Sequence, residues 1–438
     1  MRLIPASKLA QRLMLLVLPA VLILVWLLGG FAWWPRHWAR QALERRDYAA
    51  ARKWAEVAER WNASNAETEW LLARIERKFG RTDEAARHLR AAQRLGGNLE
   101  LVRREELLIQ AQTGALGDIL RELDRLLIEH SEDGAEICEA YVNGLLINGR
   151  VEEALLIIQS WQASFPKDPQ PDHLLGRIAE FQNRTTAAER HYRAAIAKSP
   201  QHAPSLFGLG RTLTSANRWD EALQVYQQCR DLTYRSVAEV GMARCHKSLG
   251  RGDEALRLLR RATAQPQESF REAQRQLGES TEYDSLRLEL GTLEASLGNT
   301  DSALAALQQA VDFNPKHRQA RYQLAQILNT AGRTEDAKTH FKWYVAMEQK
   351  IAERDRQHDL VERHPRDLEA RHRLGSLYLE TDSSETGLFW LRGVLAEDPQ
   401  HRATHELLAD YYEAQSAKDP SVQAVARFHR QMARQAAQ

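Results

Sequence analysis

Three arginines recur at nearly equal intervals in the middle of the chain. Arg177, Arg211 and Arg244 are 34 and 33 residues apart, and Lys247 follows Arg244 by one helical turn. A guanidinium group stays charged at physiological pH and binds a carboxylate through two parallel hydrogen bonds. If equivalent positions share one face, these four side chains predict a surface that binds acidic segments. The alternative is that they belong to ordinary solvated helix faces, which are normally rich in charge.

A second group of polar residues lies closer to the C-terminus, where Tyr322, Gln326 and Asn329 recur at helical spacing. Hydroxyl and amide side chains can hydrogen-bond the backbone of a peptide. Tyr322 and Asn329 therefore join the predicted ligand-binding set, with a less charged character than the arginines.

The chain contains no pattern that is typical of catalysis or metal binding. It has no Gly-x-Ser-x-Gly, no phosphate-binding loop and no His-Glu-x-x-His. The pair Gly208-x-Gly210 lies in a helical context, whereas a phosphate-binding fingerprint needs a strand, a turn and a helix. His401 and His405 would share a helix face, but the sequence shows no third metal ligand. We therefore predict a protein that is not an enzyme and that needs no cofactor and no metal.

Composition narrows the class of protein. The 438 residues suggest about three domains of ordinary size. The 60 Lys and Arg residues against 59 Asp and Glu leave a net charge of +1, so no basic field points to nucleic acid. The mean hydropathy of −0.53 excludes a polytopic membrane protein. Cys138, Cys229 and Cys245 are too few for a disulfide scaffold, so we expect them to pack as small hydrophobic side chains, although Cys229 and Cys245 could approach each other.

The elements that must position the arginines follow one repeating pattern. A marker alanine is preceded by Gly or Asn five residues earlier, and it is followed by apolar or small side chains four and seven residues later. Intervals between successive markers are 69, 34, 34, 33, 48 and 34 residues, and the first of these equals two intervals of about 34. The marker alanines are Ala85, Ala154, Ala188, Ala222, Ala255, Ala303 and Ala337.

Each interval fits two antiparallel helices. Leu206, Leu209 and Leu213 form an apolar stripe at helical spacing. Gly or Asn after the first helix supplies a left-handed backbone conformation, and alanine allows the two helices to approach closely. Asp220 and Glu221 place carboxylates at the start of a second helix, where the helix dipole favours negative charge.

This pattern resembles the tetratricopeptide repeat family, whose unit is a helix–turn–helix of 34 residues. The resemblance is carried by Leu206-x2-Leu209-Gly210 with Ala222-x3-Tyr226, by Leu174-Leu175-Gly176 with Ala188-x3-Tyr192 and Pro200, and by Leu374-Gly375-x2-Tyr378 with Leu391 and Pro399. It implies an all-α fold, a right-handed superhelical solenoid. It also implies a groove, lined by the first helices, that binds peptides or partner helices. Arg177, Arg211 and Arg244 occupy the ninth position of three successive units, which would face that groove.

The predicted organisation has three parts. A basic tail covers residues 1–12, a transmembrane helix covers 13–34, and a solenoid of about eleven units covers 35–438. We expect units to start at about 32, 66, 101, 135, 169, 203, 236, 284, 318, 368 and 402. Polar insertions lie near 270–283 and near 349–364, and we expect both to project from the solenoid or to lengthen its helices.

The segment from Leu13 to Trp34 has no charged residue. As a helix, its 22 residues would span ~33 Å, enough for a bilayer core of about 30 Å. Trp33, Trp34 and Trp38 stand at its end, where indole rings favour the headgroup layer. A cleaved signal peptide is the alternative, because Arg2, Lys8 and Arg12 precede the segment and Gly30-Phe31-Ala32 resembles a cleavage site.

These features predict a membrane-tethered interaction scaffold that binds proteins or peptides, acidic ones in particular, and no nucleic acid or small-molecule substrate. Its expected location is a single-pass attachment in a bacterial inner membrane, with the solenoid on the extracytoplasmic side. The alternative is a secreted or periplasmic assembly factor released by signal cleavage. An enzyme is disfavoured because the repeats leave no stretch long enough for a catalytic domain.

Overall fold

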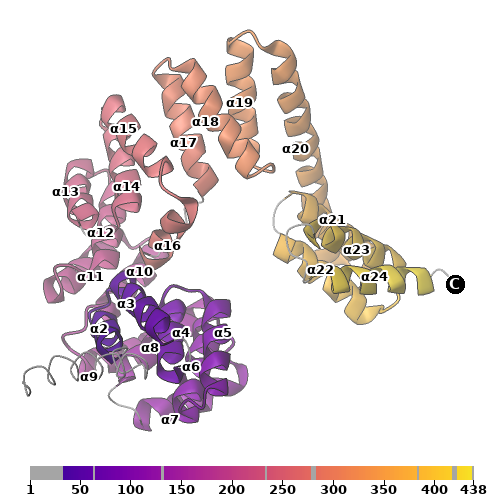
Figure 1. Cartoon of the computed structure of the whole chain (residues 1–438). Coiled ribbons are helices and arrows are strands. Elements are labelled where there is room, and N and C mark those ends of the chain that lie inside the picture. The colour runs from indigo at the N-terminus through magenta and orange to yellow at the C-terminus, as the bar shows by residue number, and fades with distance from the viewer. Residues whose placement is uncertain are drawn as a thin grey trace, which may run out of the picture. The chain divides into compact units, whose positions relative to one another are not determined.

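The computed structural model describes residues 33–62, 65–129, 133–231, 234–277, 283–381, 384–416 and 422–436. Over these residues the regular elements are all helices, without a strand (Figure 1). The chain divides into two compact units, which we call the N-terminal body (up to Thr281) and the C-terminal body (from Glu282). The expectation of an all-α, repeat-built fold is confirmed.

In the described part of the N-terminal body the helices pair into seven repeats, numbered here 1 to 7. The pairs are α2 (Trp33–Glu44) with α3 (Tyr48–Trp61), α4 (Ala66–Lys78) with α5 (Thr82–Arg94), α6 (Leu99–Gln112) with the 3-10 turn η2 (Gly117–Ile119) and α7 (Leu120–Glu129), α8 (Gly134–Ile147) with α9 (Val151–Ser164), α10 (Gln170–Phe181) with α11 (Thr185–Lys198), α12 (Ala203–Ser215) with α13 (Trp219–Asp231), and α14 (Arg235–Ser248) with α15 (Gly252–Thr263).

The described C-terminal body contains repeats 8 to 11. These are α17 (Tyr283–Ser296) with α18 (Thr300–Phe313), α19 (Arg318–Thr330) with α20 (Thr334–Arg363), α21 (Leu368–Thr381) with α22 (Ser384–Glu397), and α23 (Arg402–Ser416) with α24 (Gln423–Gln435). Across both bodies, the first helix of each repeat begins within two residues of the unit start expected from the sequence.

The turn between the two helices of a repeat has the expected conformation. Asn183 and Asn217 have φ angles of 56° and 58°, and the five glycines that precede marker alanines have φ between 70° and 80°. Most side chains disfavour this left-handed region, whereas glycine, which has no side chain, and asparagine adopt it readily. The Gly and Asn residues therefore mark the turns in the sequence. The seven marker alanines are at most 1% exposed, as close helix approach requires. The marker pattern is therefore the physical signature of the turn and of the helix contact.

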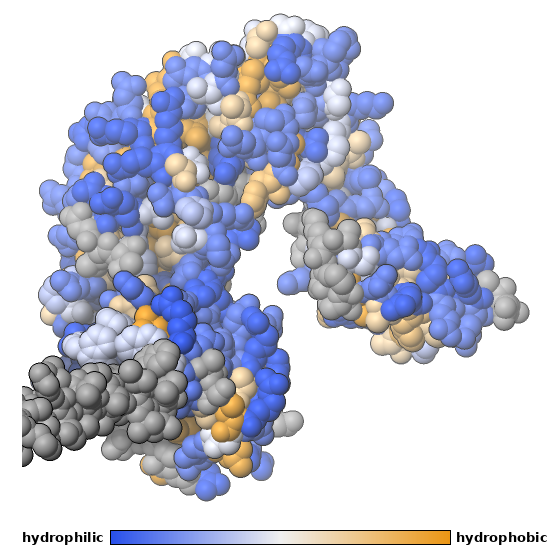
Figure 2. Space-filling view, in the orientation of Figure 1, coloured by the Kyte–Doolittle hydropathy of each residue, from blue (hydrophilic) through white to orange (hydrophobic). Residues whose placement is uncertain are grey.

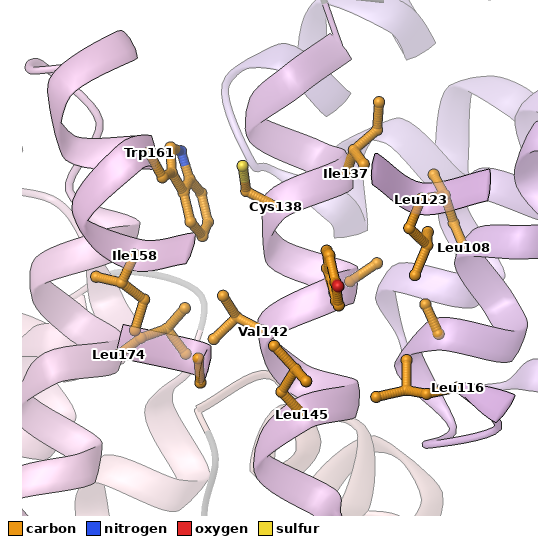
Figure 3. Packing of buried hydrophobic residues seen from close by; sticks show 14 of the residues in the cluster. Leu108, Leu116, Leu123, Ile137, Cys138, Val142, Leu145, Ile158, Trp161 and Leu174 are labelled. Atoms are coloured by element: carbon orange, nitrogen blue, oxygen red, sulfur yellow. The ribbon is translucent and has the colours of Figure 1, made fainter. Parts of the chain in front are cut away.

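Apolar packing runs continuously from one repeat to the next. Figure 3 shows one such cluster, in which Trp161 of α9 and Leu174 of α10 lie beside Cys138 and Val142 of α8. The indole N–H of Trp161 donates to the Asp168 carboxylate at 3.1 Å, which satisfies the polar atom of a fully buried ring. The core is thus shared between neighbouring repeats rather than gathered in one centre.

Two tyrosines are held between glycines of successive repeats. A Cβ at Gly176 of α10 or at Gly208 of α12 would lie within 2.7 Å of the Tyr192 ring. Gly210 and Gly241 enclose the Tyr226 ring in the same way. The repeats can therefore approach this closely only because these four helical positions lack a side chain.

The two polar insertions differ from each other. The second lengthens a helix as expected, because α20 runs unbroken for 30 residues. The first does not project: α16 (Gln267–Leu277) packs on α12 and α14 (Figure 1), and its Phe270, Gln274 and Leu277 are buried. Three buried positions at helical spacing are enough to dock a helix that is otherwise polar. The expectation that this insertion projects is wrong.

No helix among the described residues is both long enough and apolar enough to cross a membrane. The predicted transmembrane helix at 13–34 falls almost wholly on residues 1–32, which lie outside the described residues.

Candidate functional site

The N-terminal body contains an open cavity of about 840 Å³, called here the central cavity. Its lining comes from segments that are far apart in sequence: the α2–α3 turn, α8, the α9–α10 loop, the start of α12 and the end of α16. The exposed cations at its wall are Arg45, Lys167, Arg275, which pairs with Glu268, and Arg177, the first of the predicted arginines. The cavity thus combines several repeats with positively charged side chains.

One wall of the cavity is held in place by buried ion pairs. Arg46 contacts the carboxylate of Asp168 at 3.1 Å across 122 residues, and Lys78 contacts that of Glu139 at 2.7 Å. Burial disfavours a charged carboxylate, but the positive charges of Lys78 and Arg46 outweigh it and lower the pKa of Glu139 to about 2. These charges are already paired, so they position the wall rather than offer binding capacity to a ligand.

Arg77 belongs to the same charge network but lies deeper. Its side chain is fully buried, and its guanidinium contacts Glu105 of α6 and, at 2.7 Å, Glu136 of α8. Gln112 accepts a third hydrogen bond at 3.3 Å. Despite burial, the two carboxylates raise the pKa of Arg77. The sequence places Arg77 beside groove positions, but the structure makes it a link between repeats 2, 3 and 4.

A pair of histidines is buried at the cavity wall. The Nδ1 of His202 lies 2.8 Å from the Ser205 hydroxyl, and that hydroxyl lies 3.3 Å from Nδ1 of His173. The Nε2 of His202 contacts the Gln170 amide oxygen at 3.2 Å. The same arrangement recurs in the C-terminal body with His372, Thr404 and His401. Both junctions follow a Pro-x-His sequence, Pro200 with His202 and Pro399 with His401, so this sequence marks a hydrogen-bonded contact between repeats at these two places.

Acidification should destabilise the N-terminal body through this pair. Burial first, and the charge of Arg46 second, lower the pKa of His202 from 6.5 to about 3, and burial also lowers the pKa of His173. The folded state keeps both rings neutral, whereas the unfolded chain binds protons below pH 6.5. We expect full stability above about pH 6.5 and a loss toward pH 3 of about 1.4 kcal/mol per pH unit for each ring. Urea unfolding at neutral pH and at about pH 5 measures this loss.

The control uses the same junction in another repeat. His202→Asn places a residue that favours the N-cap position at the start of α12 and removes one of the two buried rings, so it should remove that ring's share of the pH dependence. His317→Asn changes the equivalent position before α19, where Leu288 stands in place of the second histidine. An equal pH dependence in the wild-type protein and in His202→Asn would contradict the assignment.

The structure places the other predicted arginines in different surroundings. Arg211 reaches from α12 to α10 and pairs with both oxygens of Glu180 at 2.6 Å. Arg244 is half-buried on α14 and also has interaction partners, whereas Lys247 is exposed. Sequence spacing could place these residues on one face, but it contained no signal for the Glu180 partner 31 residues away.

Tyr322 and Asn329 lie on α19 of the C-terminal body, whereas the predicted arginines lie in the N-terminal body. The Tyr322 ring packs against Phe341 and Tyr344 of α20, with ring centroids 6.0 and 5.0 Å apart. Asn329 is exposed. Tyr322 therefore stabilises the helix pair of repeat 9, and Asn329 keeps a side chain that a ligand can reach.

The cysteines and the other polar clusters add no reactive site in the described residues. Cys138, Cys229 and Cys245 are free and buried, and burial raises the pKa of Cys138 and of Cys229 to about 12. Their thiols are therefore protonated at neutral pH and weak nucleophiles. His358, Asp359 and Glu362 could approach a common ion, but they lie on the surface of α20, where such groups are common without one.

Helix–turn–helix repeats with this turn, alanine contact and spacing define the class of protein. A family model described as tetratricopeptide repeat matches residues 173–232 and 288–344, so these two stretches are tetratricopeptide repeats. No curated protein sequence matches the chain.

Similar solved structures include MamA, PilF and YrrB. MamA is 19% identical, with 42% of this chain and 94% of that chain covered and a TM-score of 0.35. The PilF protein of Pseudomonas aeruginosa is 16% identical, with 55% and 97% covered and a TM-score of 0.40. YrrB, described as a repeat protein with an unusual peptide-binding site, is 21% identical, with 49% and 95% covered and a TM-score of 0.29.

Proposed function

We propose that this protein is a membrane-tethered scaffold whose central cavity binds acidic peptide segments of partner proteins. Its function is binding and not catalysis. Proteins of this repeat family generally mediate protein–protein interactions, and the proposal adds the location and the chemistry of the site. The tether rests on the uncharged segment from Leu13 to Trp34, which precedes repeat 1.

One observation carries the acidic preference. The chain's own helix α16 carries Glu268 and Glu272 as well as Arg271 and Arg275, and it lies on α12 and α14, the first helices of repeats 6 and 7. Its Glu272 pairs with Arg81 at 2.6 Å, and its Glu268 lies 3.5 Å from the same guanidinium. The N-terminal body therefore already binds two carboxylates of one of its own helices through the guanidinium of Arg81. A partner segment with carboxylates meets the same chemistry at Arg45, Lys167 and Arg177 in the adjacent cavity.

Charge reversal at the cavity tests this proposal. Arg177→Glu in the full chain should weaken binding of a fluorescein-labelled oligoglutamate peptide about tenfold, because one unfavourable charge contact costs about 1.4 kcal/mol or more. Fluorescence anisotropy at low and at physiological salt measures the dissociation constant. Arg177 is a sharper choice than Arg211, since Arg211→Glu would also place a second carboxylate beside Glu180.

The control is Arg190→Glu, which reverses an exposed charge on α11 outside the cavity. An oligoglutamine peptide of the same length shows how much binding depends on the carboxylates. Equal affinity of the wild-type protein, Arg177→Glu and Arg190→Glu for oligoglutamate would overturn the proposed site.

In a second candidate function the protein binds the same kind of partner, but it is released from the membrane. If the segment before repeat 1 is cleaved near Gly30-Phe31-Ala32, the solenoid is a released periplasmic assembly factor. The intact mass of the mature protein distinguishes the two, because cleavage removes about 32 residues. For the tethered form we propose a bacterial inner membrane with the solenoid on the extracytoplasmic side, which proximity labelling from the C-terminus tests.

A further inference from the structure

Repeat 1 has a cluster of indole rings outside its core, called here the tryptophan face: Trp33, Trp34 and Trp38 of α2 with Trp54 and Trp61 of α3. The Trp54 ring lies against both Trp34 and Trp38, with ring centroids 5.2 and 6.5 Å apart. Trp61 follows Trp54 by two helical turns, so it shares that face of α3. Because α2 and α3 are antiparallel, the end of α3 lies beside the start of α2.

Four of these five rings are exposed, and Trp54 is partly buried against the core of repeat 1. The exposed fraction is 60% for Trp33, 47% for Trp34, 42% for Trp61 and 37% for Trp38. The residues that α2 buries are Pro35, Ala39 and Ala42. Much of the surface seen in Figure 2 is hydrophilic. Contiguous exposed apolar surface of this kind marks a contact with a partner or a membrane.

The charges beside the face indicate which kind of contact it makes. Arg36 and Arg40 of α2 both pair with the single Glu67 carboxylate, which leaves one net positive charge among these three groups. The rings therefore supply the apolar part of the contact, and the remaining charge is compatible with an anionic headgroup layer. An indole ring has an apolar body and one N–H donor, and it is stabilised in the headgroup layer, where one side is apolar and the other is wet.

The position of the face in the chain selects the partner. The uncharged run from Leu13 enters α2 directly and ends at Trp34, within the face itself. If that run occupies the hydrocarbon layer, connectivity alone holds the start of α2 at the headgroup level. Trp54 and Trp61 come from the next helix, beyond the run, and they extend the same surface sideways.

We propose that the tryptophan face docks repeat 1 on the lipid headgroup layer, so that the membrane contact includes α3 as well as the tether. This inference rests on the proposed tether. It adds that the first repeat lies against the bilayer surface and does not hang from a flexible stalk. The solenoid then leaves the membrane in one fixed orientation.

Site-directed spin labelling of the full chain tests the docking. The native cysteines are at most 5% exposed, so a single introduced cysteine can be labelled selectively. Trp61→Cys reports on the face, and Ile128→Cys, on the 84% exposed Ile128 of α7, is the matched control in repeat 3. Both labelled proteins are reconstituted in phosphatidylcholine vesicles containing phosphatidylglycerol, and the label's collisions with oxygen and with a water-soluble nickel complex are compared.

Docking predicts that the ratio of oxygen to nickel collisions is several-fold higher at position 61 than at position 128. Equal, water-like ratios in protein that floats with the vesicles would overturn the docking and leave the tether intact. Protein that does not float with the vesicles would instead overturn the tether. Spin–spin broadening at position 61 would mean that a second copy covers the face, and low collision rates with both reagents would mean that the chain itself covers it. Either outcome overturns the proposal.

Discussion

Replacing Arg77 with alanine should lower the free energy of unfolding of the N-terminal body by about 3–5 kcal/mol. The guanidinium is fully buried and is the partner of Glu105, which is only 1% exposed. Removing it leaves a carboxylate in a medium where water cannot solvate it, and that penalty exceeds the loss of the ion pair itself. Urea unfolding followed by circular dichroism measures the change in midpoint.

Two variants separate the buried charge from the loss of side-chain volume. Arg77→Leu combined with Glu105→Leu removes both charges and should regain most of the lost stability, since apolar replacements of a buried pair are often neutral. Arg87→Ala breaks a pair with Glu84 in which both side chains are at least 42% exposed, and it should change stability by less than about 0.5 kcal/mol. If Arg77→Ala and Arg87→Ala lowered the free energy of unfolding by a similar amount, the argument that burial makes the Arg77 ion pair costly to break would be contradicted.

Replacing Gly208 with alanine should destabilise the protein by about 1–3 kcal/mol. The new Cβ would lie 2.5 to 3.0 Å from three atoms of the Tyr192 ring, closer than carbon atoms can approach. The ring cannot move away, because Gly176 of the preceding repeat contacts it from the other side. The variant must therefore separate repeats 5 and 6 or tilt the ring, and either change opens the core.

Gly393→Ala is the control for helix propensity. Gly393 lies within α22, and nothing is within 4 Å of a Cβ added there. Alanine should stabilise this helix by about 0.5–1 kcal/mol, because glycine loses more backbone entropy on folding. Thermal unfolding of both variants should therefore shift in opposite directions. A rise in the midpoint for Gly208→Ala would contradict the packing argument.

The repeats could be predicted from the sequence because their determinants are local. A left-handed turn admits Gly or Asn, and a close helix contact admits Ala, so single residue types report the geometry. Repeat 1 shows where this fails: its turn places Arg46 at φ 58°, and arginine gives no signal for that conformation. The docking of α16 was also hidden, because only three of its eleven residues are buried.

The site was harder to predict because its contacts are between repeats. The position of Arg177 at the cavity follows from repeat spacing, but the pairing of Arg211 with Glu180 depends on how two repeats pack. Arg77 contacts carboxylates 28 and 59 residues away. The sequence shows the type of each such residue and the spacing between them. It does not show which residue of another repeat each one contacts.

The length of α20 has a consequence for the direction in which the last repeats face. An α-helix turns ~100° per residue, so the roughly 16 extra residues in α20 advance ~160° beyond four complete turns. Repeats 10 and 11, which follow α20, are therefore rotated by nearly half a revolution relative to a ladder without the insertion. The C-terminal body is in this sense two short ladders of two repeats each, joined by one long helix, α20.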